Sequence, residues 1–388
     1  PYESFYSLDA ILRTAGRVWF TRTRLLEWNP SGAVDKGRTD LIGSYRSMWI
    51  GPAMVLVITI LLMQMRAEAL LVAAPVLGLW ALSPLFTWWI STPLAPREAR
   101  LTADQTMFLR KMARKTWAFF ETYVSQEDHW LPPDNFQEHP APKVAHRTSP
   151  TNMGLALLAN LSAYDFGYLS AGQLIERTAH TVDTMATLER FQGHFYNWYD
   201  TQTLKPLLPM YVSSVDSGNL AGHVMTLHSG LLSLPEHQIL AERTFEGLRD
   251  PLALMSELLA TAEMAQVEVL QHTLAAACHH RPTGLTHAHQ SLTLLIAQTD
   301  AVTAQLDPVA NAEAHRWAHA VARQCRDALT ELRLLAPWIG LPSTGDFIRL
   351  FPELDRIPTL RTLAALDNEW LSPIDARLGP GTSETERA

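Results

Sequence analysis

The sequence has little cysteine and little charge: two cysteines among 388 residues, and 18% charged side chains. Cys278 and Cys325 lie far apart in the chain, which excludes a scaffold held by several disulfides and suits a reducing compartment. The charged fraction is below the ~25% typical of soluble domains. The net charge of −8 argues against nucleic acid as the main partner, because phosphate binding requires clustered lysine and arginine.

Several motifs of catalysis and nucleotide binding are also missing. The chain has no GxGxxG or GxxxxGK[ST] loop, no GxSxG nucleophile elbow and no HExxH zinc motif. We therefore expect no cofactor. No signal peptide is expected either, since the N-terminus shows no charged, apolar and cleavage regions in succession. With Pro1 as the first residue and a polar tail, we expect an excised segment of a longer polypeptide.

Two neighbouring runs contain no charged residue, residues 48–65 and residues 69–96. About 20 apolar residues span a bilayer as a helix, so each run is a candidate span. Tryptophans at both borders, Trp49 and the Trp88–Trp89 pair, suit an interfacial aromatic belt. A buried hairpin of core helices is the alternative. We favour a transmembrane helical hairpin over residues 47–96, since two adjacent charge-free runs of this length are uncommon in soluble folds.

Basic residues set the expected orientation of this hairpin. Arginines and lysines precede the first run and follow the second, whereas the short loop between the runs carries only Arg66. The positive-inside rule then places both flanks in the cytoplasm and the loop outside. Residues 1–46 are accordingly expected to form a cytoplasmic segment, and the soluble part after the hairpin is expected to face the cytoplasm.

The chain after the hairpin has a mainly helical pattern. Residues 97–125 predict an amphipathic helix, and residues 235–335 are helical in pattern almost throughout. Four prolines between His129 and Thr148 predict a loop without regular structure. Ser149, followed by Pro150, has the features of a helix N-cap. Helix pairs joined by polar and aromatic loops predict a toroid of helical hairpins, whose loops gather at one end and form the site.

Further along, Ser170 is the expected cap of the next helix. From Gly193 the pattern changes and predicts a short β-hairpin that turns at residues 200–203. This segment contains a run of aromatic and polar residues: Tyr196, Asn197, Trp198, Tyr199 and Asp200. Aromatic faces stack on sugar rings, and Asn and Asp bond hydroxyl groups. Simple packing of these aromatics on the helices beneath is an equally supported alternative.

A second polar cluster follows: Ser213, Ser214, Asp216, Ser217 and Asn219. It suits recognition of hydroxyl groups, with Asp216 as the candidate acid or base. The favoured alternative makes Asp216 the N-cap of another helix. Glycosidases commonly use two carboxylates that flank the scissile bond. Asp200 and Asp216 are the in-chain candidates for such a catalytic pair, although their sequence separation determines no distance.

A cysteine- and histidine-rich stretch resembles a metal site in composition only: Cys278, His279, His280, His287 and His289. Its spacing matches no zinc pattern. The stretch follows a helical segment and contains a proline and a glycine, Pro282 and Gly284. We therefore favour a polar connection between two helices and expect no metal, leaving the role of the stretch open.

Two stretches, residues 129–169 and 190–224, carry PPDN, RTSPTN, FYNWYD and SVDSGNLAG in this order. They resemble the region after the membrane spans in cyclic β-1,2-glucan synthases. These large proteins of the bacterial inner membrane join a glycosyltransferase, a glucoamylase-like cyclisation domain and a phosphorylase-like domain. Over residues 235–388 the resemblance is weaker, with FPELDR and IPTLR, and suggests a helical insertion or continuation ending in a polar tail.

The resemblance implies that residues 97–234 are the first part of an (α/α)6 toroid, in a membrane protein that crosses the inner membrane more than once. It implies a retaining transglycosylase that closes β-1,2-glucan chains into rings, in which a sugar hydroxyl resolves a covalent intermediate. The family's catalytic glutamates lie in motifs resembling LLASEARL and GISES, and neither occurs here. We therefore expect the chain to be incomplete as a catalyst and to use the catalytic glutamates of another part of the synthase.

What the resemblance transfers to this chain is contact with substrate. The candidates are Asn152, Tyr196, Trp198, Asp200, Ser213, Ser214, Asp216 and Asn219. The expected partners are a β-1,2-glucan chain, the lipid bilayer and the remaining domains of the same synthase. A non-catalytic β-glucan-binding module and a structural membrane adaptor are the alternative functions.

Overall fold

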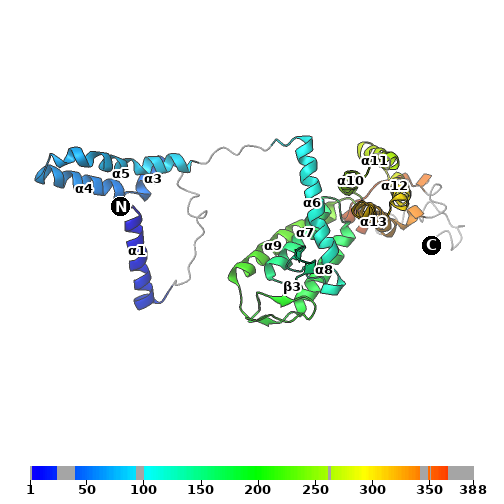
Figure 1. Ribbon diagram of the computed structural model, residues 1–388, viewed down its shortest axis with the longest axis horizontal. Helices are drawn as coiled ribbons and strands as arrows, with labels where there is room; N and C mark the ends of the chain where they lie inside the picture. The colour runs from blue at the N-terminus through cyan, green and yellow to red at the C-terminus, as the bar shows by residue number, and fades with distance from the viewer. Residues whose placement is uncertain are drawn as a thin grey trace. The chain divides into compact units, whose positions relative to one another are not determined.

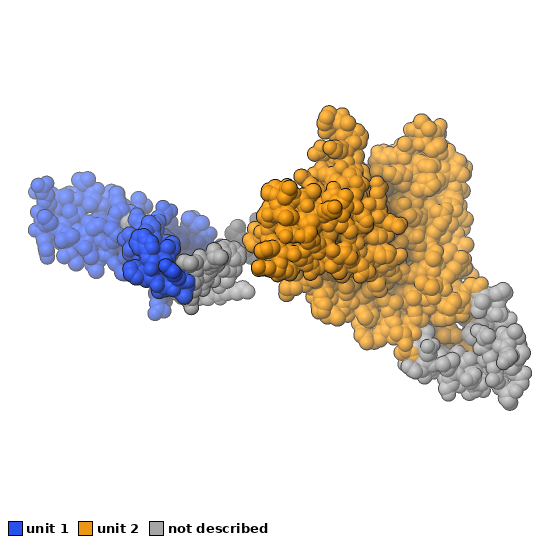
Figure 2. Space-filling model, turned by 90° about the horizontal axis from the view of Figure 1, so that it is seen from below, with its two compact units in different colours: residues 1–100 blue, residues 101–388 orange. Residues whose placement is uncertain are grey.

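The computed structural model describes residues 2–23, 40–92, 100–260, 264–340, 348–349 and 351–365. The chain divides into two compact units, residues 1–100 and residues 101–388, which Figure 2 colours separately. Both are mainly helical, as predicted. The finer boundaries expected at residues 47, 97 and 235 stay predictions.

The first unit is built from apolar and amphipathic helices. Helix α1 (Tyr2–Gly16) continues into the π-helical turn η1 (Arg17–Thr21). After it come α3 (Leu41–Ser47), α4 (Ile50–Met65) and α5 (Ala69–Ser91). Helices α4 and α5 pack side by side as a hairpin (Figure 1), as the two charge-free runs predict.

The two predicted membrane spans differ in helix length. Helix α5 is long and apolar enough to cross a bilayer, while α4 reaches that length only together with α3, from which it is bent by 67°. The described residues therefore contain one candidate span, or two if the bent α3–α4 pair counts as one. The two helices of the predicted hairpin are confirmed; α5 is a candidate span by length and composition, and the crossing of a membrane by the hairpin stays a prediction.

The first half of the second unit holds α6 (Ala103–Tyr123), α7 (Pro150–Asp165), α8 (Ala171–Thr187) and α9 (Ser214–Ser233). Helix α7 packs against the other three (Figure 1). Met153, Leu157 and Leu220 bury the contact between α7 and α9. The packing of these apolar faces sets the position of α7 relative to α9.

The helix caps show where local sequence rules succeed. Ser149 and Ser170 cap α7 and α8 as predicted, each accepting the N–H of the residue three positions later. The expectation for Asp216 is wrong, because Ser213 is the N-cap of α9 and its hydroxyl accepts the N–H of Asp216. Serine and aspartate are both good caps, so the choice between them depended on where the chain turns.

The segment before α7, expected to lack regular structure, forms short strands. Strand β1 (Phe136–Gln137) pairs with β2 (Lys143–Val144), and β3 (Arg147–Thr148) pairs with β6 (Tyr199–Asp200). The prolines lie outside the paired residues, so they do not remove ladder hydrogen bonds. The β3–β6 pairing brings the loop before α7 against the loop before α9.

The predicted β-hairpin region contains two reversals. Strand β4 (Arg190–Phe191) pairs with β5 (His194–Phe195), and Gly193 supplies a positive φ of 88° in that turn. The expected turn at residues 200–203 is also present, and it brings Tyr199 opposite Pro206 in an antiparallel bridge.

The second half of this unit contains the largest hydrophobic core. Around it pack α10 (Glu242–Ser256), α11 (Met264–His279), α12 (Leu285–Gln305) and α13 (Ala312–Leu335). The short helix α15 (Leu360–Ala364) contacts the 3-10 turn η4 (Leu234–Glu236). Further 3-10 turns are η3 (Gln126–Asp128), η6 (Pro337–Gly340) and η7 (Pro352–Asp355). Trp317 on α13 is almost fully buried in this core. The described helices do not establish an (α/α)6 toroid, which stays a prediction.

Candidate functional site

The starts of α7 and α9 lie side by side and share a carboxylate. Thr151 on α7 donates its hydroxyl to Asp216 Oδ1 at 2.7 Å, and the Ser213 hydroxyl donates to Oδ2. Asn219, one turn along α9, donates to the Thr151 hydroxyl at 3.1 Å. Asp216 therefore links the first turn of α9 to the first turn of α7 through Thr151, which lies 65 residues earlier in the chain.

The segment between β5 and α9 also contacts this carboxylate, through the side chain of Asn197. In the orientation that satisfies both ends of its amide, Asn197 donates to Asp216 Oδ2 at 2.9 Å. Its oxygen then accepts the Trp198 indole N–H at 2.8 Å and the Tyr211 hydroxyl at 2.7 Å. We call Thr151, Asn197, Ser213, Asp216 and Asn219 the Asp216 cluster.

A second carboxylate, Asp134, lies beside this cluster. Its Oδ1 accepts the Asn152 side-chain amide at 3.2 Å. Its Oδ2 accepts Arg147 Nε at 3.1 Å and Arg147 Nη2 at 2.8 Å. The Arg147 guanidinium lies 4.7 Å from the centroid of the Trp198 ring, within the range of a cation–π contact. Asp134 thus positions a half-exposed arginine against the tryptophan.

These contacts bring together segments from four places in the sequence. PPDN supplies Asp134, RTSPTN supplies Arg147 and Asn152, and the aromatic run supplies Trp198. The fourth segment, SVDSGN, supplies Asp216 and its neighbours. An indole ring beside amide, hydroxyl and guanidinium groups is the combination of apolar surface and convergent polar groups expected of a ligand site.

Asp200 does not share this arrangement, because its carboxylate bonds within its own turn. Its Oδ1 accepts the N–H groups of Gln202 and Thr203 at 3.1 and 2.7 Å, and the Thr203 hydroxyl at 2.9 Å. Burial raises the pKa of Asp200, but these hydrogen bonds outweigh it, so the pKa is lowered. These contacts are typical of a residue that shapes a turn, and they favour that role over catalysis.

Of the remaining residues in the aromatic run, the two tyrosines pack in the core and the tryptophan belongs to the candidate site. Tyr199 is fully buried and donates its hydroxyl to the Glu189 carbonyl at 2.7 Å. Tyr196 is half-buried and packs against the same core, so the packing alternative applies to it. Trp198 points to the Asp216 cluster instead. Ser214 is exposed at the first turn of α9, near the cluster in sequence.

Sequence reasoning did not single out Asp134, Arg147, Thr151 or Tyr211. The first three lie inside the quoted motifs PPDN and RTSPTN, which were the available signal. Their roles could not be assigned because each one contacts a residue from a distant segment. Tyr211 lies in the second resembling stretch but outside its motifs, and it is linked to the site through Asn197.

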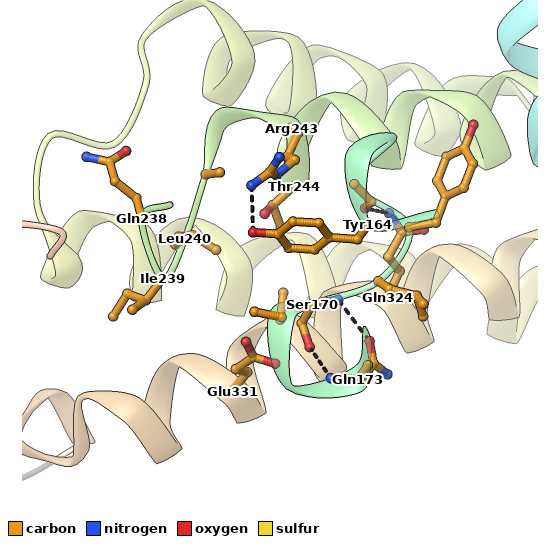
Figure 3. Close-up of a pocket in the computed structure, with 16 residues that line it drawn as sticks. Tyr164, Ser170, Gln173, Gln238, Ile239, Leu240, Arg243, Thr244, Gln324 and Glu331 are labelled. Carbon is orange, nitrogen blue, oxygen red and sulfur yellow. Dashed lines mark hydrogen bonds between the residues drawn. The ribbon is translucent and has the colours of Figure 1, made fainter. Parts of the chain in front are cut away.

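Figure 3 shows a different pocket, between α7, α8, α10 and α13, lined by Tyr164, Arg243, Gln324 and Glu331 among others. Arg243 donates to the Tyr164 hydroxyl at 2.6 Å, and burial raises the pKa of Tyr164 to about 12. The pocket volume is about 30 Å³, enough for one water. None of the predicted site residues lines this pocket. We interpret the pocket as a small gap in the packing between the helices.

The cysteine- and histidine-rich stretch is divided between two helices and their connection. Cys278 lines a groove of about 450 Å³ with Glu242 and Arg281, and burial raises the pKa of its thiol. His289, on α12, accepts a hydrogen bond from Arg333 at 3.1 Å. Within the described ranges, no three His, Cys, Asp or Glu side chains gather as a metal site would require.

No protein-family model matches the chain. Over 254 residues, 65% of its length, the chain is 37% identical to the cyclic beta-(1,2)-glucan synthase NdvB of Rhizobium meliloti (strain 1021). The match covers 9% of that protein, so the chain spans less than a tenth of the curated relative. The resemblance carried by the four motifs is thereby confirmed: this chain is a relative of a cyclic β-(1,2)-glucan synthase.

Proposed function

We propose that the chain is a membrane-anchored segment of a cyclic β-1,2-glucan synthase and contributes the sugar-binding part of its retaining transglycosylase, or cyclisation, domain. One observation carries this proposal. The four segments that resemble such synthases meet in space, around Asp216 and Trp198. Packing alone would not require the polar residues of all four segments to converge.

The chemistry of the cluster suits a glucan. A glucose ring presents apolar C–H faces and several hydroxyl groups, so a site for it combines an aromatic face with donors and acceptors. Trp198 supplies the aromatic surface, and Arg147 adds a guanidinium that Asp134 holds in place. Exposed Asn219 and Ser214, at the start of α9, add groups that bond hydroxyls. We propose that a β-1,2-glucan chain lies along this end of α7 and α9.

The chemical step is assigned to carboxylates from another part of the synthase. A retaining transglycosylase uses one carboxylate as nucleophile and a second as acid and base. Asp216 accepts hydrogen bonds from three side chains, and Asp200 accepts three within its turn. Both sets of contacts favour positioning roles. A non-catalytic β-glucan-binding module is the second candidate function, and the same contacts favour it.

The hairpin of α4 and α5 is the proposed anchor in the bacterial inner membrane. Its support is the length and composition of α5 and the bent α3–α4 pair. The basic residues on both flanks of the hairpin support a cytoplasmic location for the second unit, by the positive-inside rule. The lipid bilayer and the remaining domains of the synthase are then the partners of the chain, together with the glucan.

Calorimetric titration of the full chain with a linear β-1,2-glucan oligosaccharide tests the binding proposal. Trp198→Ala removes the aromatic face, and we expect affinity to fall by about tenfold or more. Phe108→Ala is the matched control, because Phe108 is an exposed aromatic on α6 in a different part of the unit. Equal affinity of wild type and Trp198→Ala would contradict the proposal, and no binding by either would favour the structural adaptor.

A further inference from the structure

Helix α1 has a continuous apolar face that is exposed. Leu8, Leu12, Ala15 and Trp19 follow at intervals of four, three and four residues, which places them on one side of a helix. Leu8, Leu12 and Trp19 expose 56%, 63% and 74% of their surface. No residue of α1 is buried. Tertiary packing of this face therefore does not account for the pattern.

The opposite face of α1 is polar and carries charge. Arg13 pairs with Asp9 one turn earlier, at 2.8 Å between Nε and Oδ2. Arg17 and Arg22 add two more positive charges at the end of α1 and just after η1. A helix with one apolar face and an arginine-bearing polar face is the pattern of helices that lie in a membrane interface.

The contacts of α1 place it at one end of the α4–α5 hairpin. Tyr6 donates its hydroxyl to the Ser47 carbonyl at 3.1 Å, just before α4. Phe5 packs edge-on against Trp49, with ring centroids 6.1 Å apart. Figure 1 shows α1 running across the long axis of this hairpin. A helix across the end of a spanning hairpin lies parallel to the bilayer surface.

Aromatic residues mark the same end of the hairpin. Trp49 precedes α4, and Trp89 lies in the last turn of α5. Both tryptophans are exposed and lie toward the end of the hairpin away from the α4–α5 loop, where Gly51 of α4 lies against Trp80 and Ser83 of α5. Exposed tryptophans favour the headgroup level of a membrane. The depth at which α1 contacts Trp49 is therefore the interface.

We infer that α1 with η1 is an in-plane membrane helix, whose apolar face enters the lipid surface at the end of the hairpin. The occupant of this face is the bilayer itself. The Phe5–Trp49 contact makes the surface continuous with the apolar hairpin, and the arginines suit lipid phosphates. This inference rests on the proposed location of the hairpin in a bilayer and goes beyond the glucan-binding function.

Spin labelling of the full chain in vesicles of phosphatidylcholine and phosphatidylglycerol tests it. Nitroxides are placed at Leu12→Cys on the apolar face, at Ala10→Cys on the polar face, and at Leu79→Cys within α5 as the hairpin reporter. All three variants carry Cys278→Ala, and the buried Cys325 stays unlabelled. Collision rates with oxygen and with a water-soluble nickel complex report the depth of each label.

We expect the Leu12 label about 5–10 Å below the lipid phosphates and the Ala10 label in water. The Leu79 label should lie deepest. A Leu12 label as accessible to nickel as the Ala10 label would overturn the inference, and so would a Leu12 label shielded from both reagents, which indicates a protein contact. Leu79 in hydrocarbon with Leu12 in water refutes only the role of α1. Leu79 in water refutes the proposed anchor itself.

Discussion

Replacing Asp216 distinguishes a positioning carboxylate from a catalytic one. In Asp216→Ala, Thr151, Ser213 and Asn197 each lose an acceptor. A hydrogen bond to a charged group contributes about 1.5–3 kcal/mol, and an unpaired donor costs more when it is buried. The cluster is only partly buried, so water replaces some of the loss. We expect the second unit to lose about 2–3 kcal/mol of stability.

Asp216→Asn is the milder, matched variant. It retains one oxygen for the Thr151 hydroxyl, and its amide can donate to Ser213 or Asn197 once those groups reorient. We expect it to lose about 1 kcal/mol. Thermal unfolding of the full chain in detergent, followed by tryptophan fluorescence, measures both variants. For a unit of this size, Tm should fall by about 3–6 °C in Asp216→Ala and by about 2 °C in Asp216→Asn.

Glucan turnover provides the refuting result. We expect the chain alone to produce no rings from linear β-1,2-glucan, in wild type or in either variant. A chain that turned glucan over, and lost this activity in Asp216→Asn at an unchanged Tm, would show that Asp216 acts on substrate. The positioning role derived from its three donors would then be wrong.

Three further predictions concern stability. Asp250→Ala should lower the free energy of unfolding by about 3–5 kcal/mol in chemical denaturation, because it removes the fully buried carboxylate to which Arg110 and the Tyr168 hydroxyl both donate; a cost below 1 kcal/mol would contradict this. Ser170→Ala should cost about 1 kcal/mol by removing the capping box of α8, with Ser170→Thr as the control that retains the cap. The charged form of Asp200 stabilises its turn above the unfolded pKa near 3.9, and this contribution should disappear as pH falls through the lower pKa of the folded state. The protection of the Thr203 amide, which is its exchange rate relative to an unstructured peptide at the same pH, should then fall at low pH in wild type but not in Asp200→Asn; protection that stays constant with pH in wild type would contradict it.

The helical character of the chain could be predicted because its signals are local. Ser149 and Ser170 cap their helices through bonds to residues three positions later. The charge-free runs predicted the α4–α5 hairpin in the same way, from composition. Local rules were insufficient at Asp216, where Ser213 is an equally good cap only three residues away. They also missed strand β3, because it pairs with β6, which lies more than fifty residues later.

The sequence by itself determined the helices, the apolar hairpin and the four motifs that mark this chain as a relative of a cyclic β-(1,2)-glucan synthase. Tertiary structure alone decided which motif residues meet. Thr151 reaches Asp216 because buried leucines pack α7 on α9, and Arg147 reaches Trp198 because β3 pairs with β6. Contacts within one helical turn follow from residue identity and spacing. Contacts between residues 65 positions apart depend on which apolar faces the folded chain buries together.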